Sequence, residues 1–316
     1  MGKIIQANDV RDELFHLHKY GQNAGLKIGF NNLDKLYSIK EGRSTIIYGH
    51  PTSGKSQFLI QTLCALATKH NKKCLIYTPE TGSAHEIYAE IIHCLTGKTF
   101  DKRSINYQIS EKELINVHPF VQDYFKIIDV DEKGLDFDEW LNLTDEAIRD
   151  YGIFSSSVDN WNDIEHKYTG TISEYLKQQL PRVNRHARKN NTHNFIVAHA
   201  RNPDMRGGDK YPPAPRPDEI EGGSVWYAKA LNLICVHRDY EEHGEGWRQS
   251  SEAQIIIRKI KKRAEGEKGT AKLTFDVFRN AYYENLGERH YLETPFNNIQ
   301  QTKNQFNNLE ITIAPF

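Results

Sequence analysis

The segment Gly49–Ser56 limits what this chain can fold into more than any other feature. It reads Gly-His-Pro-Thr-Ser-Gly-Lys-Ser and fits the pattern G-x-x-x-x-G-K-[ST], known as the Walker A loop. An apolar run typical of a buried strand, 43–48, lies directly before it, and a helical pattern, 55–69, begins inside its last two residues. In that context the backbone N–H groups of the loop surround phosphate oxygens. The sequence therefore predicts a nucleoside triphosphate site.

The residue types in this loop also predict its ligands. We expect Lys55 to reach the β and γ phosphates and the Ser56 hydroxyl to complete a Mg²⁺ shell, so the expected cofactors are ATP, or another NTP or dNTP, and Mg²⁺. The candidate nucleotide contacts are Gly49, His50, Pro51, Thr52, Ser53, Gly54, Lys55, Ser56 and Gln57.

Strand patterns alternate with helical patterns along most of the chain. The expected strands are 43–48, 73–78, 125–130, 153–158, 195–198, 231–237, 254–260 and 272–275, and the expected helices are 55–69, 83–95, 136–151 and 172–190. Such alternation is typical of an α/β fold, in which helices cover both faces of a predominantly parallel sheet.

Three segments depart from this alternation. Residues 9–20 form an amphipathic helix pattern that opens at Asp9 and stops at Gly21. The 201–224 segment holds five of the eleven prolines, and a loop of this length is usually functional or disordered. Beyond the last strands the chain is rich in Asn and Gln, typical of a flexible or partner-docking tail. We therefore divide the chain into an N-terminal linker helix (1–27), a motor domain (28–290) and a tail (291–316).

Composition excludes several classes of protein. The 41 Lys and Arg nearly balance the 42 Asp and Glu, which excludes a globally basic nucleic-acid binder but not a locally basic loop. No apolar stretch is long enough for a membrane span, and the charged N-terminus lacks the apolar block of a signal peptide. The four cysteines show no metal-binding or disulfide spacing and are expected to be buried thiols. We expect a cytoplasmic protein.

A hydrolase needs one carboxylate for the metal and another for the attacking water. Glu80 follows the second expected strand and can face the γ-phosphate, although a surface glutamate fits the same position. Asp159 and Asp129 both follow strand patterns and are the two metal candidates. The apolar pattern before Asp129 is cleaner, because three serines interrupt the strand before Asp159.

At this point the sequence resembles the RecA-type motor domain of hexameric replicative DNA helicases, the DnaB and Twinkle type. The similarity covers residues 28–276 and favours Asp159, because Val158–Asn162 is similar to the D-P-[WY]-N segment of that family. The other matching segments, in chain order, are Gly29–Asp34, Gly42, the Walker A loop, Thr78–Glu80, Val197–Arg201, Glu221–Ser224, Val236–Asp239, Lys261–Arg263, Gly269–Thr270 and Leu273–Phe275.

The resemblance implies a RecA-like P-loop NTPase fold and a role for each matching residue. Lys55 and Ser56 would bind phosphate and Mg²⁺, Glu80 would polarise the attacking water, Asp159 would hold the metal's water shell, His199 would sense the γ-phosphate, and Lys261 and Arg263 would reach the nucleotide of a neighbouring subunit. Alternatively, His199 is a core histidine and the 261–263 cations are a solvated strand end. The resemblance also implies a homo-oligomer, expected to be a hexamer.

The candidate DNA contacts lie directly after the expected γ-phosphate sensor. They are Arg201, Arg206, Lys210 and Arg216, four cations in a proline-rich loop that several carboxylates dilute. Six copies of such a loop make a positive pore that binds the phosphate backbone without sequence preference, whereas a single copy is also compatible with a solvated surface loop.

The function predicted first is an ATP-dependent, ring-forming DNA helicase motor that moves on single-stranded DNA in replication, 5′ to 3′ by resemblance. No primase, zinc or collar domain precedes the motor in this sequence, which favours a phage-encoded protein in the host cytoplasm with a separate primase or loader protein. Two alternatives share the fold: a RecA-like recombination ATPase, and an ATP-gated assembly or loader protein. A small-molecule kinase fits least, because neither a lid nor an acceptor site is visible.

Overall fold

The computed structural model describes residues 3–79, 82–130, 134–201, 210–244 and 246–297. Within them, ten strands form one sheet in the order β10-β9-β8-β7-β6-β1-β5-β4-β2-β3. The strands are β1 (Arg43–Gly49), β2 (Lys73–Tyr77), β3 (Phe125–Ile127), β4 (Ile153–Val158), β5 (His193–His199), β6 (Asn232–His243), β7 (Gly246–Lys259), β8 (Gly269–Asp276), β9 (Ala281–Asn285) and β10 (Arg289–Tyr291).

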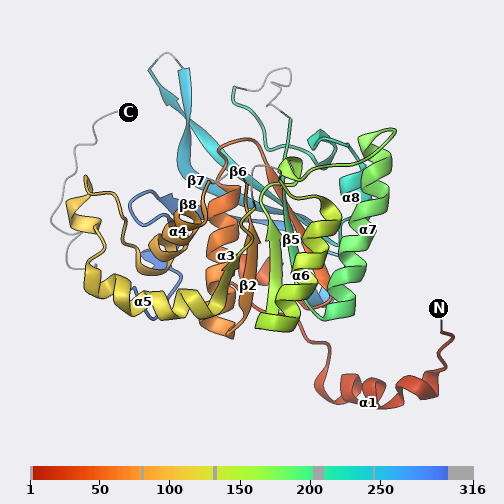
Figure 1. The fold of residues 1–316 in the computed structure, drawn as a ribbon. Coiled ribbons are helices and arrows are strands. Elements are labelled where there is room, and N and C mark those ends of the chain that lie inside the picture. The colour runs from red at the N-terminus through yellow and green to blue at the C-terminus, as the bar shows by residue number, and fades with distance from the viewer. Residues whose placement is uncertain (1–2, 80–81, 131–133, 202–209, 245, 298–316) are drawn as a thin grey trace.

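Helices cover both faces of this sheet (Figure 1). They are α1 (Arg11–Tyr20), α2 (Leu33–Leu36), α3 (Lys55–His70), α4 (Ala84–Thr96), α5 (Glu111–Tyr124), α6 (Phe137–Tyr151), α7 (Ile172–Asn190) and α8 (Val225–Lys229). Five single turns of 3-10 helix accompany them: η1 (Ala7–Val10), η2 (Ile105–Tyr107), η3 (Trp161–Asp163), η4 (Pro217–Glu219) and η5 (Arg263–Glu265).

The sheet has a parallel part and an antiparallel part that share β6. The strands β6, β1, β5, β4, β2 and β3 pair in parallel, whereas β6 to β10 pair as successive antiparallel neighbours. Parallel strands need crossover connections, and the helices α3 to α7 supply them. The mostly parallel sheet with flanking helices confirms the predicted fold class, and the short N-terminal helix is present.

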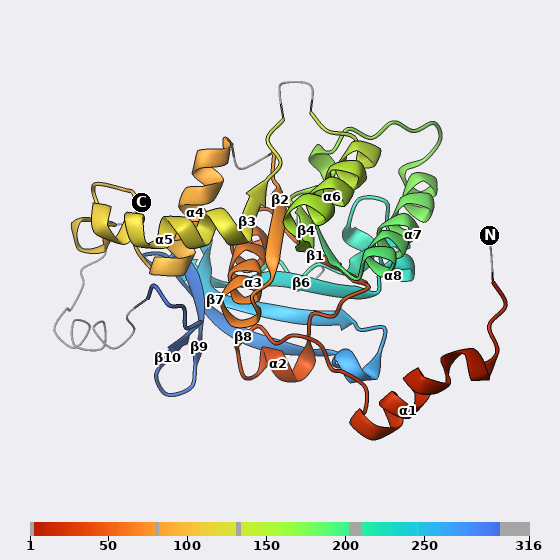
Figure 2. The same cartoon turned by 60° about the horizontal axis from the view of Figure 1, so that its bottom comes forward.

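Alternate side chains of each buried strand enter two separate cores. On β1, Ile47 packs into the core beneath α2, α3, α4 and α5, whereas Ile46 and Tyr48 pack into the core beneath α6, α7 and α8. Figure 2 shows α3 to α5 and α6 to α8 as separate groups of helices. This double burial explains why the parallel strands read as continuous apolar runs.

The serines that interrupt the strand before Asp159 fit because helix α6 brings polar partners to them. The Ser156 hydroxyl accepts a hydrogen bond from Trp140 Nε1 at 3.1 Å and lies 3.0 Å from the Thr144 hydroxyl. Ser157 donates to the Leu75 carbonyl at 3.3 Å. A buried hydroxyl is tolerated when it is hydrogen-bonded, so β4 stays a central strand.

Several elements differ from the expected ones. The expected strand 125–130 ends at Ile127, and Asp9 lies in the turn η1 instead of capping the helix that begins at Arg11. The strands β6 and β7 continue well past their apolar cores as a long hairpin, which rises above the sheet in Figure 1. Helix α5 and the strands β9 and β10 were not expected.

The two ends of the described chain behave differently. Helix α1 stops at Gly21 as expected, buries no residue and extends away from the sheet (Figure 1). At the other end, Leu292 is buried, and the Phe296 ring packs edge-on against Phe120 of α5 with the ring centroids 5.1 Å apart. The first residues of the predicted tail therefore pack against the body, while 298–316 lie outside the described residues. The four cysteines are buried, as expected.

Candidate nucleotide and nucleic-acid site

The Walker A loop connects the end of β1 to the start of α3 through close backbone contacts. A Cβ atom at Gly49 would clash with the carbonyl of Val236 on β6, and Gly54 has a φ of +89°. Both positions therefore require glycine. The Lys55 side chain is buried, and its Nζ donates a hydrogen bond to the His50 carbonyl at 2.8 Å. The structure thus brings together the nine predicted nucleotide contacts, Gly49 to Gln57, around one helix N-terminus.

Strand register places His199 beside this loop. His199 ends β5, where it is the register partner of Gly49, and the Ala200 N–H donates to the Gly49 carbonyl at 3.0 Å. Its Nε2 lies 2.8 Å from Asn160 Nδ2, in the segment that follows β4. The predicted sensor and the segment matching Walker B are therefore in direct contact.

Asp159 lies at the same edge of the sheet, directly after β4. It is buried, and its N–H donates to the Tyr77 carbonyl of β2 at 2.9 Å. Asp129, the alternative candidate, is exposed beyond the edge strand β3. The strand order supports the choice of Asp159, because β4 lies between β5 and β2, whereas β3 is the outermost strand.

A Mg²⁺ ion would fit the donor set at this edge. The Ser56 hydroxyl, in the first turn of α3, and the Asp159 carboxylate are hard oxygen ligands, and Mg²⁺ commonly takes few protein ligands together with phosphates and waters. Within the described part of the chain, no cluster of three or more His, Cys, Asp or Glu side chains has the arrangement of a metal site. That finding agrees with an ion held largely by the nucleotide.

Glu80 lies outside the described residues, so its predicted role as the residue that orients water stays a prediction. Thr78 directly follows β2 and is buried at the same edge of the sheet as Asp159 and the Walker A loop. The chain therefore leaves β2 at the edge where the prediction needs it.

Lys261 and Arg263 lie at the opposite edge of the sheet. They follow β7, whose last residue pairs with Leu233 at the start of β6, and the Lys261 N–H contacts Asn232 Oδ1 at 3.5 Å. The turn η5 is fixed to the start of β1 by an ion pair of 2.8 Å between Arg43 and the buried Glu265. From Arg43 to Gly49 the strand rises about 20 Å. These exposed cations therefore cannot reach the Walker A loop of their own chain.

The predicted DNA contacts that the structure describes are exposed and engaged in local interactions. Arg201 Nη2 donates to the Asp218 carbonyl at 3.0 Å. Arg216 pairs with Asp218 at 3.1 Å and with Glu219 at 3.6 Å, and Lys210 pairs with Glu242. Exposed pairs of this kind contribute about 0–1 kcal/mol, so a nucleic-acid phosphate can replace them. Arg206 lies outside the described residues.

Sequence reasoning missed the residues that support the Walker A loop from β9. The Tyr282 hydroxyl donates to the Gly54 carbonyl at 3.1 Å, and Gln61 of α3 exchanges two hydrogen bonds of 2.7 and 2.8 Å with the Tyr282 backbone. Burial raises the pKa of Tyr282, which keeps the hydroxyl protonated and able to donate. On the same strand, buried Glu284 accepts 2.8 Å hydrogen bonds from the Asn31 and Asn32 N–H groups. The Tyr-rich run 281–285 was the available signal.

These features define a P-loop nucleotide-binding domain on a RecA-type α/β sheet. In sequence, 287 residues are 27% identical to "Twinkle homolog protein, chloroplastic/mitochondrial" of Arabidopsis thaliana, covering 88% of this chain and 39% of that protein. The chain thus spans less than half the length of this relative. No family model matches the chain.

Two solved structures share the fold. The first, the ATPase domain of a DnaB-like helicase, superposes with a TM-score of 0.71 at 16% identity, covering 92% of this chain and 100% of that one. The second, a DnaB-like replicative helicase described with its interactions with primase, gives a TM-score of 0.68 at 17% identity over 89% of this chain and 67% of that one. Together with the Twinkle homologue, they confirm the predicted resemblance to the RecA-type motor domain of DnaB-like and Twinkle-like helicases.

Proposed function

We propose that this chain is an ATP-dependent, ring-forming DNA helicase motor that moves along single-stranded DNA in replication, 5′ to 3′. The confirmed likeness to replicative helicase motor domains supports the class of activity, and the Walker A loop supports a nucleotide as the energy source. No described helix is long and apolar enough to cross a membrane.

The proposed chemistry uses groups at the carboxyl edge of the parallel strands. The Walker A amides and Lys55 bind the triphosphate, and Ser56 and Asp159 hold Mg²⁺. When bound, Mg²⁺ neutralises charge on the phosphates and fixes their orientation. Glu80 orients the attacking water, and His199, through its 2.8 Å contact with Asn160, senses whether the γ-phosphate is present. These groups position and stabilise, as phosphoryl transfer requires.

The observation that carries this proposal is the separation between the two halves of the ATPase site. The Walker A loop and the cations Lys261 and Arg263 lie at opposite ends of β1, joined to it through the Arg43–Glu265 ion pair. Supplied by a neighbour, such cations raise phosphoryl-transfer rates by several orders of magnitude. Each subunit therefore completes the site of the next, and we propose a hexamer.

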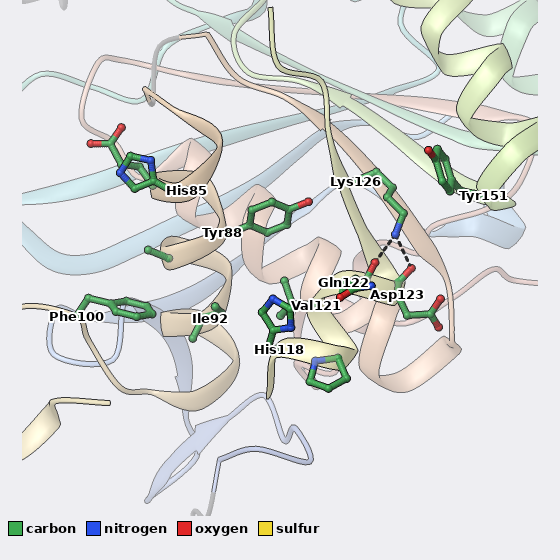
Figure 3. Close-up of a pocket in the computed structure, with 13 residues that line it drawn as sticks. His85, Tyr88, Ile92, Phe100, His118, Val121, Gln122, Asp123, Lys126 and Tyr151 are labelled. Carbon is green, nitrogen blue, oxygen red and sulfur yellow. Dashed lines mark hydrogen bonds between the residues drawn. The ribbon is translucent and has the colours of Figure 1, made fainter. Parts of the chain in front are cut away.

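The surface also offers a way to hold neighbouring subunits together. Helix α1 exposes Leu14, Phe15, Leu17 and Tyr20, at 51, 60, 44 and 64%. A largely apolar groove of about 1000 Å³ lies between α4 and α5. Figure 3 shows Tyr88 and Ile92 of α4 facing Val121 of α5 across it. We assign this groove to α1 of an adjacent copy, since neither surface has a partner among the described residues.

ATP hydrolysis with and without single-stranded DNA tests the proposal. We expect DNA to stimulate turnover, and we expect Lys55→Ala and Arg263→Ala each to lower it at least a hundredfold. Adding Lys55→Ala protein to Arg263→Ala protein should restore part of the activity, because mixed rings then contain some complete sites. Hydrolysis that ignores DNA would instead identify an ATP-gated loader. Strand exchange without unwinding would identify a recombination ATPase.

A further inference from the structure

The side chain of His50, the second residue of the Walker A loop, points away from the loop and contacts the segment after β5. His50 is 5% exposed, and its Nδ1 lies 3.0 Å from the Arg201 carbonyl. Burial lowers the pKa of His50, so the ring is neutral near pH 7 and carries one N–H. A carbonyl can only accept, so that proton is on Nδ1 and His50 donates.

Arg201 connects this contact to the turn that carries Arg216. The Arg201 N–H donates to the Glu219 carbonyl at 2.8 Å, and its guanidinium donates to the Asp218 carbonyl at 3.0 Å. The Arg216 N–H is held in turn by the Glu219 carboxylate at 2.7 Å. A continuous series of hydrogen bonds thus runs from the Walker A loop through Arg201 to an exposed cation of the proposed DNA surface.

The backbone of His50 is held by the group that must respond to nucleotide. Lys55 Nζ donates to the His50 carbonyl at 2.8 Å. A bound triphosphate competes for the same ammonium group, since a charged phosphate oxygen is a stronger acceptor than a neutral carbonyl. Nucleotide binding therefore changes the hydrogen bonding of the residue whose side chain holds Arg201.

We propose that His50 is a positioning residue that transmits nucleotide occupancy of the Walker A loop to Arg201 and the turn 216–220. The inference rests on the nucleotide site of the proposed function and adds a second connection, separate from the contact between His199 and Asn160. It predicts that removing the Nδ1 donor uncouples DNA from hydrolysis while leaving nucleotide binding intact.

Three variants of the full-length protein separate this role from simple anchoring. His50→Phe keeps a ring but removes the donor, whereas His50→Asn places an amide N–H where Nδ1 was. Tyr48→Phe is the matched control, because the Tyr48 hydroxyl anchors the same segment through the Pro215 carbonyl at 3.1 Å but lies outside the Walker A loop. Circular dichroism verifies that each variant is folded.

The readout is hydrogen exchange of the amides in 216–221, with and without a saturating non-hydrolysable ATP analogue. We expect at least a threefold nucleotide-dependent change in exchange rate for the wild type, His50→Asn and Tyr48→Phe, and none for His50→Phe. His50→Phe should bind the analogue within threefold of the wild type. Stimulation of kcat by single-stranded DNA should fall at least fivefold in His50→Phe, with the KM for ATP nearly unchanged.

Other results would overturn the inference. It is wrong if the wild type binds the analogue without a change in exchange, if His50→Phe still responds, or if Tyr48→Phe loses the response equally. Loss of analogue binding in His50→Phe would make His50 a nucleotide ligand and not a coupling residue. A wild type that binds no nucleotide would instead overturn the proposed function, so the two failures are distinguishable.

Discussion

The hydroxyl of Tyr282 donates a hydrogen bond to the carbonyl of Gly54 across 3.1 Å, joining an outer antiparallel strand to the Walker A loop. Removing this hydroxyl in Tyr282→Phe should weaken nucleotide binding about fivefold, since such a bond contributes about 1 kcal/mol. A fluorescent-nucleotide titration measures the effect. The neighbouring variant Tyr283→Phe should bind normally, and equal affinities in the two variants would contradict the prediction.

Gly54→Ala should abolish nucleotide binding. At a φ of +89° a side chain is strained, and the added Cβ would also clash with the Tyr282 hydroxyl. Gly152→Ala is the matched control, because Gly152 has a φ of +70° and nothing within 4 Å of the added atom. It should lower the free energy of unfolding by about 1 kcal/mol and leave binding unchanged. Equal binding by both variants would argue against a role for close packing at Gly54.

His193 predicts acid sensitivity of the fold. Burial lowers its pKa to about 4, and the nearby Arg43 charge acts in the same direction. Between about pH 6.5 and 4 the unfolded chain therefore binds a proton that the folded chain does not. The free energy of unfolding should fall as the pH is lowered through this window, by up to about 3 kcal/mol, with no contribution above it.

Urea unfolding at several pH values measures this dependence. His193→Gln should flatten it relative to the wild type, whereas His18→Gln, in the exposed helix α1, should leave it unchanged. Burial also lowers the pKa of His237 to about 4, so part of the slope will remain. An unchanged slope in His193→Gln would show that His193 is not the source.

Glu265→Ala should impair hydrolysis in a neighbouring subunit. Glu265 is 1% exposed and pairs with Arg43, so removing it leaves a poorly compensated charge and should cost about 3 kcal/mol of stability. It should also release the turn that presents Arg263. ATP turnover should fall as in Arg263→Ala, with nucleotide affinity retained. Exposed Glu267→Ala is the control, and normal turnover in Glu265→Ala would refute the assignment.

Charge introduced on either side of the proposed α1 contact should dissociate the oligomer. Phe15→Glu on α1 and Phe100→Asp in the groove alter side chains that are 60 and 41% exposed, so the subunit fold should persist. Each should weaken association at least tenfold, about 1.4 kcal/mol, by analytical ultracentrifugation. Glu13→Gln should not. If both charged variants assemble normally, α1 binds elsewhere.

Sequence patterns predicted the parallel part of the fold well because its strands are buried on both faces. Strand β1 and helix α3, for example, end within a residue of their expected limits. Helix α5 was missed because Pro119 and the exposed Ile115 break its pattern, although Ser110 and Glu113 form a capping box that could have identified it. The polar ends of the β6–β7 hairpin carry no apolar alternation, so its length could not be predicted.

Prediction of the site depended on how local each part is. The Walker A loop is contiguous, so its sequence alone defines it. Asp159 could not be separated from Asp129 by the strands before them, because the distinction is strand order, which brings β4 and not β3 beside β5. The support from Tyr282 could not be predicted, since it joins residues 228 positions apart. Glu80 and Arg206 stay predictions.

The position of Arg263 at one end of β1 and the Walker A loop at the other has a consequence for counting. Two copies that meet through these surfaces use different faces, so the contact is heterologous and does not saturate in a dimer. An open assembly of n copies then contains n − 1 complete sites, and only closure supplies the last one. The fraction of competent sites therefore rises with assembly length and reaches unity only when the rotation between copies closes on itself.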